Sequence, residues 1–503
     1  MAEKLLLGVD LGGSSSKATL IDSQGNVLAT ASREYPAYSP KPGWLEQDAD
    51  DLFDAVIVNI KACIEKSVID GKAISALAID AATHMAVLCD ADDKPLRRFI
   101  HWSDARSGAQ TKFLKENYSE LLRESSVNSV SPAWTLPQMM WLRENEPEVI
   151  KSTRRVYFAK DYVRHRITGD FCTDSIEAIG AMLCNDHTSR WVPELCELAG
   201  VSADMLPEIK QPGDIAGFVL PEIAAATGLA AGTPVITGTT DTALEVYASG
   251  AIAEGCATVK LATAGRICPI TAGPIASHQF FNYRHVIPGL WYPGTGTRSC
   301  AASYKWYRDI FGTDESRLAE EKGTSAYEVL NRAAEAVPAG SEKLYFHPYL
   351  LGEMTPYYDD KLRASFVGAG MHHTKGHFTR AVMEGISYSM RDCLEEIKAQ
   401  KIAVSEYRII GGGAKGKLWR QILADVLATP LTSTVDNDSS LGSAMLAGVA
   451  TGVFADFDDS VKKCVTVADV VTPIPENVEI YEKGFRDYRA IQKALAEVYH
   501  DII

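Results

Sequence analysis

The 503-residue sequence lacks several features that would each narrow its class. It has no apolar run of the roughly 20 residues that a membrane-spanning helix needs, since the longest nearly apolar stretch is 442–455. It has no basic excess, because the formal net charge is −15, whereas a nucleic-acid surface requires clustered lysine and arginine. Its ten cysteines include no Cys-x-x-Cys pair, and its N-terminal residues include no signal-type segment. These absences predict a cytoplasmic protein with free thiols, and with neither a membrane nor nucleic acid as its partner.

Length and composition predict two globular domains. A content of 46% hydrophobic and 23% charged residues is that of an ordinary folded protein, and 503 residues exceed what one hydrophobic core usually supports. A strand, a turn of small residues and a second strand occur twice, over 5–22 and 257–270. We therefore predict two α/β domains built on one plan, at 1–248 and 249–503.

Hydrophobic patterning predicts further strands and helices in both halves. Buried strands are expected over 74–79, 234–237 and 407–410. A helix over 220–229 is expected to end at Gly228, which suits a left-handed C-terminal cap. Apolar residues at helical spacing predict further helices over 379–398, 418–427 and 441–453.

The first chemical motif is the turn at 11–16, which follows the carboxylate of Asp10. Turn glycines let backbone N–H groups approach a phosphate closely, and hydroxyls and a lysine add further donors. Asp10 would hold Mg²⁺ directly or through water. The same residues also describe an ordinary hairpin turn. The residues predicted to contact nucleotide phosphate are Gly12, Gly13, Ser14, Ser15 and Lys17.

The second motif is 238–243, in which Asp241 follows a predicted buried strand. A carboxylate in this place can reach a cleft and accept the proton of a substrate hydroxyl. The alternative is that Asp241 caps the N-terminus of the next helix, and both descriptions could hold together.

The third motif, 411–418, has the spacing of a P-loop, but Leu418 stands where a P-loop has the Ser or Thr that binds Mg²⁺. A glycine turn between a strand and a helix N-terminus still suits a nucleotide.

A further group of residues is of the types that bind sugar hydroxyls and stack on sugar rings: His84, Trp102, Asp104 and Arg106.

Three histidines, His372, His373 and His377, have a spacing suggestive of a metal site. They lie in a glycine-rich region without a matching carboxylate nearby in the sequence, which favours a solvated loop.

Taken together, these residues resemble the FGGY carbohydrate kinases, and within them the xylulokinase-like branch. The resemblance runs over almost the whole chain, with the motifs in the expected order. It rests on the segments Asp10-x-Gly12-x-Ser14, 43–48, Trp102-x-Asp104-x-Arg106, 160–174, Asp241, 349–356, 411–414 with Trp419, and 441–444.

The resemblance implies two ribonuclease-H-like domains of the actin and hexokinase type, with ATP in an interdomain cleft and a small sugar mostly on the first domain. It implies Asp241 as catalytic base, Asp10 near Mg²⁺, and His84 with Thr83 beside the sugar. Trp102, Asp104 and Arg106 would belong to the same sugar site. The nucleotide-contacting positions implied in the second half are Thr263, Gly412, Gly413, Ala414 and Lys417.

The sequence also departs from the family pattern. Gly13 stands where the family usually has Thr, Ala262 begins a turn that usually begins with Gly, and Gln138 replaces a typical lysine. Ala82-Thr83-His84 replaces the Gln-Met-His of xylulokinases, so the sugar pocket is altered beside the retained histidine.

The resulting hypothesis is an ATP- and Mg²⁺-dependent kinase of pentose metabolism that phosphorylates a pentulose such as D-xylulose, with domain closure excluding water. A polyol or a sugar acid stays open as the substrate, and a homodimer stays open as the assembly. Two other classes are considered. An actin- or chaperone-like ATPase would need no sugar site, and a non-catalytic sugar sensor would usually carry a helix-turn-helix, for which the start of the sequence leaves no room.

Overall fold

The structure is a computed structural model, of which residues 4–503 are described. The chain forms two compact units. Unit 1 contains the chain up to Ile252 together with 282–291 and 436–466. Unit 2 contains 253–281, 292–435 and 467–503. The division at 248/249 stays a prediction, and the compact units differ from it because two later segments join unit 1.

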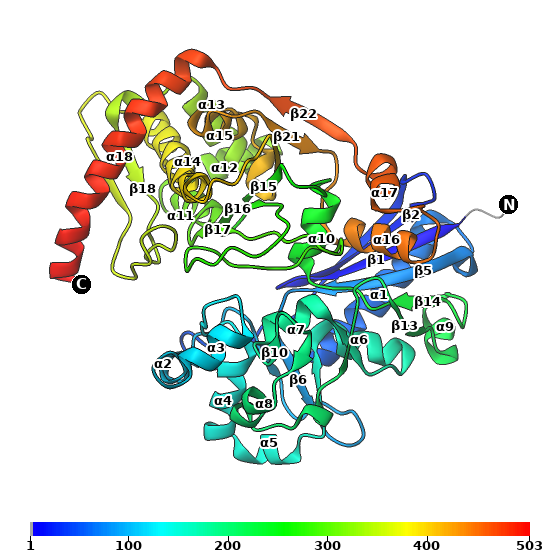
Figure 1. The fold of residues 1–503 in the computed structure, drawn as a ribbon. Coiled ribbons are helices and arrows are strands. Elements are labelled where there is room, and N and C mark those ends of the chain that lie inside the picture. Colours follow the sequence, from blue (N-terminus) through cyan, green and yellow to red (C-terminus); the bar gives the residue numbers. More distant parts are fainter. Residues whose placement is uncertain (1–3) are drawn as a thin grey trace. The chain divides into compact units, whose positions relative to one another are not determined.

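Unit 1 is built on a mixed six-stranded sheet (Figure 1). Its central strand β1 pairs antiparallel with β2 and parallel with β5, and Asp10 of β1 lies opposite Asp80 of β5. The predicted strands at the start of the chain, at 74–79 and at 234–237 are all present. In spatial order the strands are β13 (Ile215–Phe218), β14 (Pro234–Ile236), β5 (Ile74–Ala81), β1 (Leu5–Leu11), β2 (Ser15–Asp22) and β3 (Val27–Glu34).

Helices and small two-stranded sheets complete unit 1. The predicted helix at 220–229 forms as α9, and Gly228 ends it with a φ of 89°. The helices are α1 (Ala49–Ser67), α2 (Gly108–Asn117), α3 (Ser119–Ser125), α4 (Thr135–Asn145), α5 (Pro147–Ser152), α6 (Ala159–Thr168), α7 (Ser175–Ala181), α8 (Pro193–Ala199), α9 (Pro221–Thr227), α10 (Asp241–Ala248), α16 (Ser439–Ala450) and α17 (Phe457–Cys464). The small sheets pair β4 (Glu46–Gln47) with β7 (Phe99–Ile100), β6 (Ala86–Cys89) with β8 (Arg155–Phe158), β9 (Cys172–Asp174) with β12 (Glu208–Lys210), and β10 (Cys184–Asn185) with β11 (Arg190–Trp191).

Helix α16, although it comes late in the chain, packs directly on β1. A Cβ at Gly8 would lie 1.9 Å from the carbonyl oxygen of Ser440, so the two backbones meet without an intervening side chain. The hydroxyl of Ser440 lies 2.6 Å from that of Thr19 on β2. This close approach explains the small residues of α16, which the sequence predicted as a helix over 441–453.

Unit 2 repeats the plan with a second mixed six-stranded sheet. Strand β15 pairs antiparallel with β16 and parallel with β20. In spatial order the strands are β17 (Thr295–Thr297), β16 (Gly265–Pro269), β15 (Cys256–Leu261), β20 (Glu406–Ile410), β21 (Leu431–Thr434) and β22 (Val467–Val471), and β18 (Tyr345–His347) pairs separately with β19 (Ser365–Val367). Its helices are α11 (Ala301–Phe311), α12 (Thr313–Lys322), α13 (Ala326–Glu335), α14 (Lys375–Ala399), α15 (Lys417–Leu427) and α18 (Pro475–Ile502).

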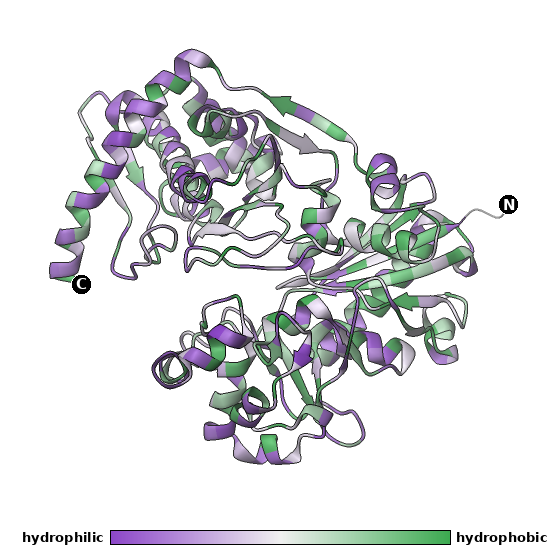
Figure 2. Ribbon diagram, in the orientation of Figure 1, coloured by the Kyte–Doolittle hydropathy of each residue, from purple (hydrophilic) through white to green (hydrophobic). Residues whose placement is uncertain are grey.

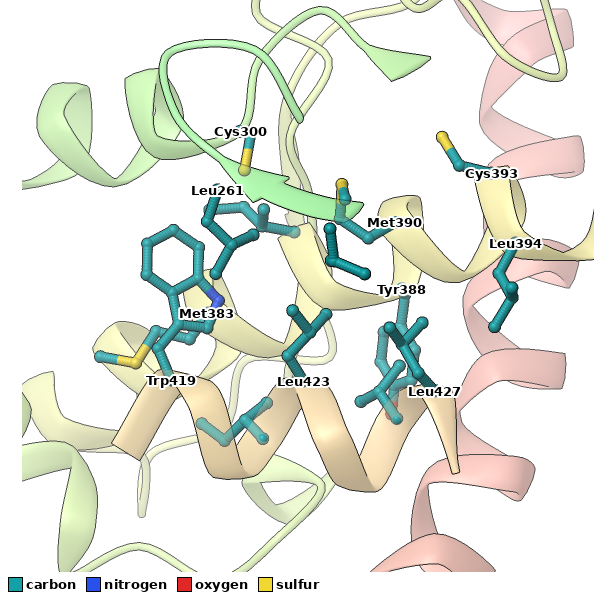
Figure 3. Packing of buried hydrophobic residues seen from close by; sticks show 14 of the residues in the cluster. Leu261, Cys300, Met383, Tyr388, Met390, Cys393, Leu394, Trp419, Leu423 and Leu427 are labelled. Carbon is teal, nitrogen blue, oxygen red and sulfur yellow. The ribbon is translucent and has the colours of Figure 1, made fainter. Parts of the chain in front are cut away.

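The core of unit 2 forms where α14 and α15 pack beside the sheet. Figure 3 shows Trp419, Leu423 and Leu427 on one face of α15, all buried, with Met383 of α14 and Leu261 of β15 in the same cluster. Figure 2 shows hydrophobic residues concentrated in the strands of both sheets. Among residues 4–503, no helix is long and apolar enough to cross a membrane.

Candidate functional site

The glycine turn of unit 1 joins β1 to β2 and is fixed by hydrogen bonds from its surroundings. The N–H of Gly12 donates to the carbonyl of Ser15 at 3.0 Å, and the Tyr35 hydroxyl donates to the carbonyl of Gly12. The side-chain amide of Gln47 donates to the carbonyl of Gly13 at 3.0 Å. Because its carbonyls are held from the protein side, the turn keeps a defined shape while Gly13 and Ser14 stay exposed.

Lys17, at the start of β2, is half-buried and forms an ion pair with Asp438. Asp438 is also the N-cap of α16, where its side chain accepts the N–H of Leu441 at 3.2 Å. Although burial opposes its charge, Asp438 and Asp436 raise the pKa of Lys17. Lys17 is therefore charged and tied to the end of α16, so a phosphate would share it with Asp438.

Carboxylates gather at the edge of the sheet beside this turn. Burial, together with repulsion from Asp241 and Asp438, raises the pKa of Asp10 to about 7. Asp80 is fully buried, and burial and the charge of Asp10 raise its pKa well above the usual value. The hydroxyl of Ser443 on α16 donates to Oδ2 of Asp80 at 2.6 Å. The protein therefore holds several carboxyl groups so close together that their ionisation is disfavoured.

This cluster fits a divalent cation. The Oδ1 atoms of Asp10 and Asp80 are buried and receive no hydrogen bond from the N–H and O–H groups of residues 4–503. Oxygen-rich, carboxylate-bearing sites are what Mg²⁺ prefers, and an added positive charge would relieve the repulsion that raises the pKa of Asp10.

Asp241 is the first residue of α10, and the N-cap of that helix is Thr240. The side chain of Asp241 accepts hydrogen bonds from the N–H of Thr242 at 2.6 Å and from its hydroxyl at 3.1 Å. Its description as the helix N-cap is therefore wrong by one position. The carboxylate remains partly exposed, as a group that accepts a proton from a substrate must be.

His84 lies in a buried cluster of aromatic rings in unit 1. Its φ is 70°, and its N–H donates to Oε1 of Glu177 at 2.7 Å. Its ring centroid lies 4.7 Å from that of Trp134, and Nε2 lies 3.3 Å from the hydroxyl of Tyr283. A Cβ at Gly180 would collide with the ring at 1.7 Å, so only glycine leaves room for it. Thr83 beside it is partly exposed.

Of the three predicted sugar-site residues in the segment 102–106, Trp102 has an exposed side chain, whereas the side chains of Asp104 and Arg106 are buried. The indole of Trp102 is 43% exposed. Arg106 bonds both carboxylate oxygens of Asp104, at 3.0 and 2.8 Å, and Glu46 at 2.7 Å, while its guanidinium lies 3.8 Å from the ring centroid of Trp44. The side chains of Asp104 and Arg106 therefore form their hydrogen bonds with other groups of the protein. These bonds fix the loop that carries Trp102.

The two predicted nucleotide turns of unit 2 lie side by side. A Cβ at Gly411 would lie 2.6 Å from the carbonyl oxygen of Leu261, immediately before the turn that carries Thr263. Gly412, Gly413 and Ala414 form a short 3₁₀ helix that leads into α15. Gly412, Thr263 and Lys417 are exposed, and nothing lies within 4 Å of a Cβ at Gly412. This surface has the open backbone that a nucleotide requires.

The histidine cluster of unit 2 has the carboxylate that the sequence did not reveal. Nε2 of both His372 and His377 lies 3.4 Å from Oε2 of Glu342. However, Nδ1 of His373 accepts the N–H of Gly370 at 2.8 Å, and Nδ1 of His377 accepts that of Thr374 at 3.1 Å. These bonds leave the Nε2 atoms of His373 and His377 protonated, as donors rather than metal ligands. The arrangement supports a hydrogen-bonded cap on α14.

Sequence reasoning missed several residues of the site. Asp80 ends a buried strand and is signalled by a lone carboxylate in an apolar run. Asp438, Trp134 and Tyr283 carry no local signal, because each reaches the site from a distant part of the chain.

The chain is similar to known proteins over almost its whole length. The model of the FGGY family of carbohydrate kinases, N-terminal domain, matches residues 5–247, and that of the C-terminal domain matches 259–451. A xylulose kinase of Bacillus subtilis (strain 168) is 31% identical over 97% of this chain and 96% of that protein. A gluconokinase of Bacillus licheniformis is 28% identical over 99% and 97%. The crystal structure of xylulose kinase from Rhodospirillum rubrum has a TM-score of 0.89 at 27% identity, covering 99% of this chain and 100% of that one. The chain belongs to the FGGY family of carbohydrate kinases and is a sugar kinase.

Proposed function

We propose that this sugar kinase transfers the terminal phosphoryl group of Mg·ATP to a hydroxyl of a pentulose such as D-xylulose. The family implies ATP as the phosphoryl donor. The observation that carries the proposal is the placement, within unit 1, of the partly exposed Asp241 and of Asp10 beside the glycine turn. Asp241 accepts the proton of the attacking hydroxyl, and the turn amides with Ser14 and Ser15 bind phosphate oxygens.

Asp10 and Asp80 would hold the magnesium ion, which when bound neutralises charge on the phosphates. In unit 2, Thr263 would bind a phosphate oxygen through its hydroxyl, and the backbone of Gly412, Gly413 and Ala414, with Lys417, would hold the adenosine. These roles follow from exposed, side-chain-poor turns at a helix N-terminus.

His84 and Trp102 supply a polar group and an aromatic face for the sugar, with Thr83 beside them. Asp104 and Arg106 act on the sugar through Trp102, whose loop they fix.

We favour a neutral ketose over a sugar acid as the substrate. A carboxylate substrate needs an available cation, and three buried cations of unit 1 are already paired. Arg106 is bonded to Asp104 and Glu46, whereas Lys160 is paired with Asp161 and Asp174. Arg164 is bonded to Asp161 and Asp170. Gluconate is the second candidate, since relatives named gluconokinase match the chain over almost its whole length.

A coupled assay of ADP release tests the proposal with D-xylulose, other pentuloses, polyols and gluconate. We expect the largest kcat/KM with a pentulose, and no ADP release without sugar. Preference for gluconate would overturn the substrate assignment but not the kinase mechanism. Sugar-independent ATP turnover at the same rate would overturn both.

A further inference from the structure

His101 is a buried imidazole that the proposed mechanism does not use, and it lies against the phosphate turn. It follows β7 and is 4% exposed. A Cβ at Gly13 would lie 3.5 Å from Nε2 of His101 and 4.0 Å from Cε1. A Cβ at position 13 would therefore lie in ordinary van der Waals contact with the ring.

The hydrogen bonds of His101 determine which nitrogen carries the proton. Nδ1 accepts the backbone N–H of Ser103 at 3.2 Å and lies 2.8 Å from the Ser103 hydroxyl. A backbone N–H can only donate, so Nδ1 presents its lone pair and Nε2 carries the hydrogen. Burial lowers the pKa of His101 to about 4, although Asp104 opposes the shift, so the ring is neutral at pH 7.

The N–H at Nε2 is a donor with no acceptor among residues 4–503, and it is closed off from solvent. Leaving a buried donor unsatisfied costs about 1–3 kcal/mol, and a bound ligand that accepts a hydrogen bond from it would recover this cost. The rest of the residue is anchored. Its N–H donates to Leu45 at 3.0 Å, and its carbonyl accepts from Asp104 at 3.0 Å and Gln138 at 3.3 Å.

We propose that Nε2–H of His101 donates a hydrogen bond to the terminal phosphoryl group of ATP bound at the turn 12–15. The inference rests on the proposed function, which places ATP phosphates at this turn. Gly13 and His101 form a matched pair: the glycine leaves the space free, and the histidine supplies the donor that a hydroxyl side chain at 13 would otherwise supply.

Glycine is what gives the phosphate access to this donor. Nε2 is closed off from solvent in the present structure, so an oxygen reaches it only when the backbone at 12–13 shifts and its hydrogen bonds from Tyr35 and Gln47 rearrange. Residues without a Cβ make such a movement inexpensive, because backbone conformations closed to other residues are open to them. A neutral donor also leaves the charge balance around Asp10 unchanged, in contrast to a lysine.

The experiment measures binding of a non-hydrolysable ATP analogue and of ADP by calorimetry, with Mg²⁺ and without sugar. His101→Leu keeps the bulk and removes the donor, whereas His101→Gln places an amide N–H near the position of Nε2. The matched control is His187→Leu, at an exposed histidine of unit 1. We expect His101→Leu to weaken the triphosphate about tenfold or more and ADP less than about twofold. His101→Gln should recover most of the loss, and His187→Leu should bind as wild type.

Equal affinity of wild type and His101→Leu for the triphosphate would overturn the inference, and so would an equal loss for ADP, which indicates a merely structural role. If His101→Leu fails to fold, the double variant Gly13→Thr/His101→Leu replaces it in the experiment. In this variant the introduced threonine supplies a hydroxyl donor and its methyl group lies beside the introduced leucine. The inference requires that it bind the triphosphate within about threefold of wild type. Failure of that variant, when folded, would also overturn the inference. A wild-type protein that binds no ATP analogue would instead contradict the proposed function.

Discussion

The two units present different chemistry on similar sheets. Unit 1 gathers ionisable side chains beside its strand–turn–strand segment, with Asp241 close enough to Asp10 and Asp80 to raise the pKa of both. Unit 2 has an exposed Thr263 at the equivalent segment. Beside it lies the glycine turn 411–413, which has no side chains and therefore no charge. The same architecture therefore supplies reactive groups in one unit and accessible backbone in the other. Loss of turnover should therefore be largest for substitutions in unit 1, whereas substitutions at the glycine turn of unit 2 should affect nucleotide affinity or folding.

Asp241→Asn should have the largest effect. It removes the proton acceptor while keeping size and shape, so kcat should fall about 10²- to 10⁴-fold. Affinity for the ATP analogue should stay within about threefold, as measured by calorimetry. Asp204→Asn, at an exposed aspartate of unit 1, is the control and should leave kcat unchanged. A variant of Asp241 that kept more than about a hundredth of wild-type turnover would show that another group is the base.

Neighbouring glycines of unit 2 separate folding from nucleotide binding. Gly411 has a φ of 91°, and a Cβ there would meet a backbone oxygen at 2.6 Å, so Gly411→Ala should cost about 2 kcal/mol or more in free energy of unfolding. Gly412→Ala meets no atom and should cost less than about 0.5 kcal/mol. It should nevertheless weaken ATP binding, because its methyl group occupies the proposed adenosine surface. Denaturation and calorimetry on both variants test this, and equal destabilisation would contradict the description of the turn.

Asp10→Asn should stabilise unit 1 in a pH-dependent manner. In the folded protein the pKa of Asp10 is about 7, above its unfolded value of 3.8, so stability is lost as the pH rises through 7. Removing the charge should therefore add about 1–3 kcal/mol at pH 8. The gain should shrink toward pH 5 and vanish below pH 4. Thermal unfolding at several pH values measures it, and a gain independent of pH would contradict the charge clustering.

Lys17→Met should have the smallest effect. Asp438 already holds the ammonium group in an ion pair, so a phosphate gains little from it. We expect the KM for ATP to rise only a few-fold, with kcat nearly unchanged. A loss of more than about a hundredfold in kcat would mean that Lys17 leaves Asp438 and contacts the transferred phosphoryl group.

Local elements of the structure could be predicted from the sequence, whereas contacts between residues far apart in the chain could not. Hydrophobic periodicity and the glycines of the turn predict the two strands and the turn over 5–22. The glycine at position 228 likewise predicts the end of α9. The pairing of Lys17 with Asp438 does not, because it joins residues 421 positions apart. The relation between Gly13 and His101 is hidden for the same reason. Glu342 was missed as the partner of the histidines because it belongs to a different loop.

One consequence of the fold concerns synthesis. Helix α16 lies against β1 through a contact that leaves no room for a side chain at Gly8, yet it is synthesised roughly 190 residues after Ile252, where the first segment of unit 1 ends. At 5–20 residues per second the nascent sheet must wait roughly 10–40 s with one face uncovered. Holdase chaperones would find their binding surface there, and a fragment ending near Ile252 should be prone to aggregation rather than fold as a functional half.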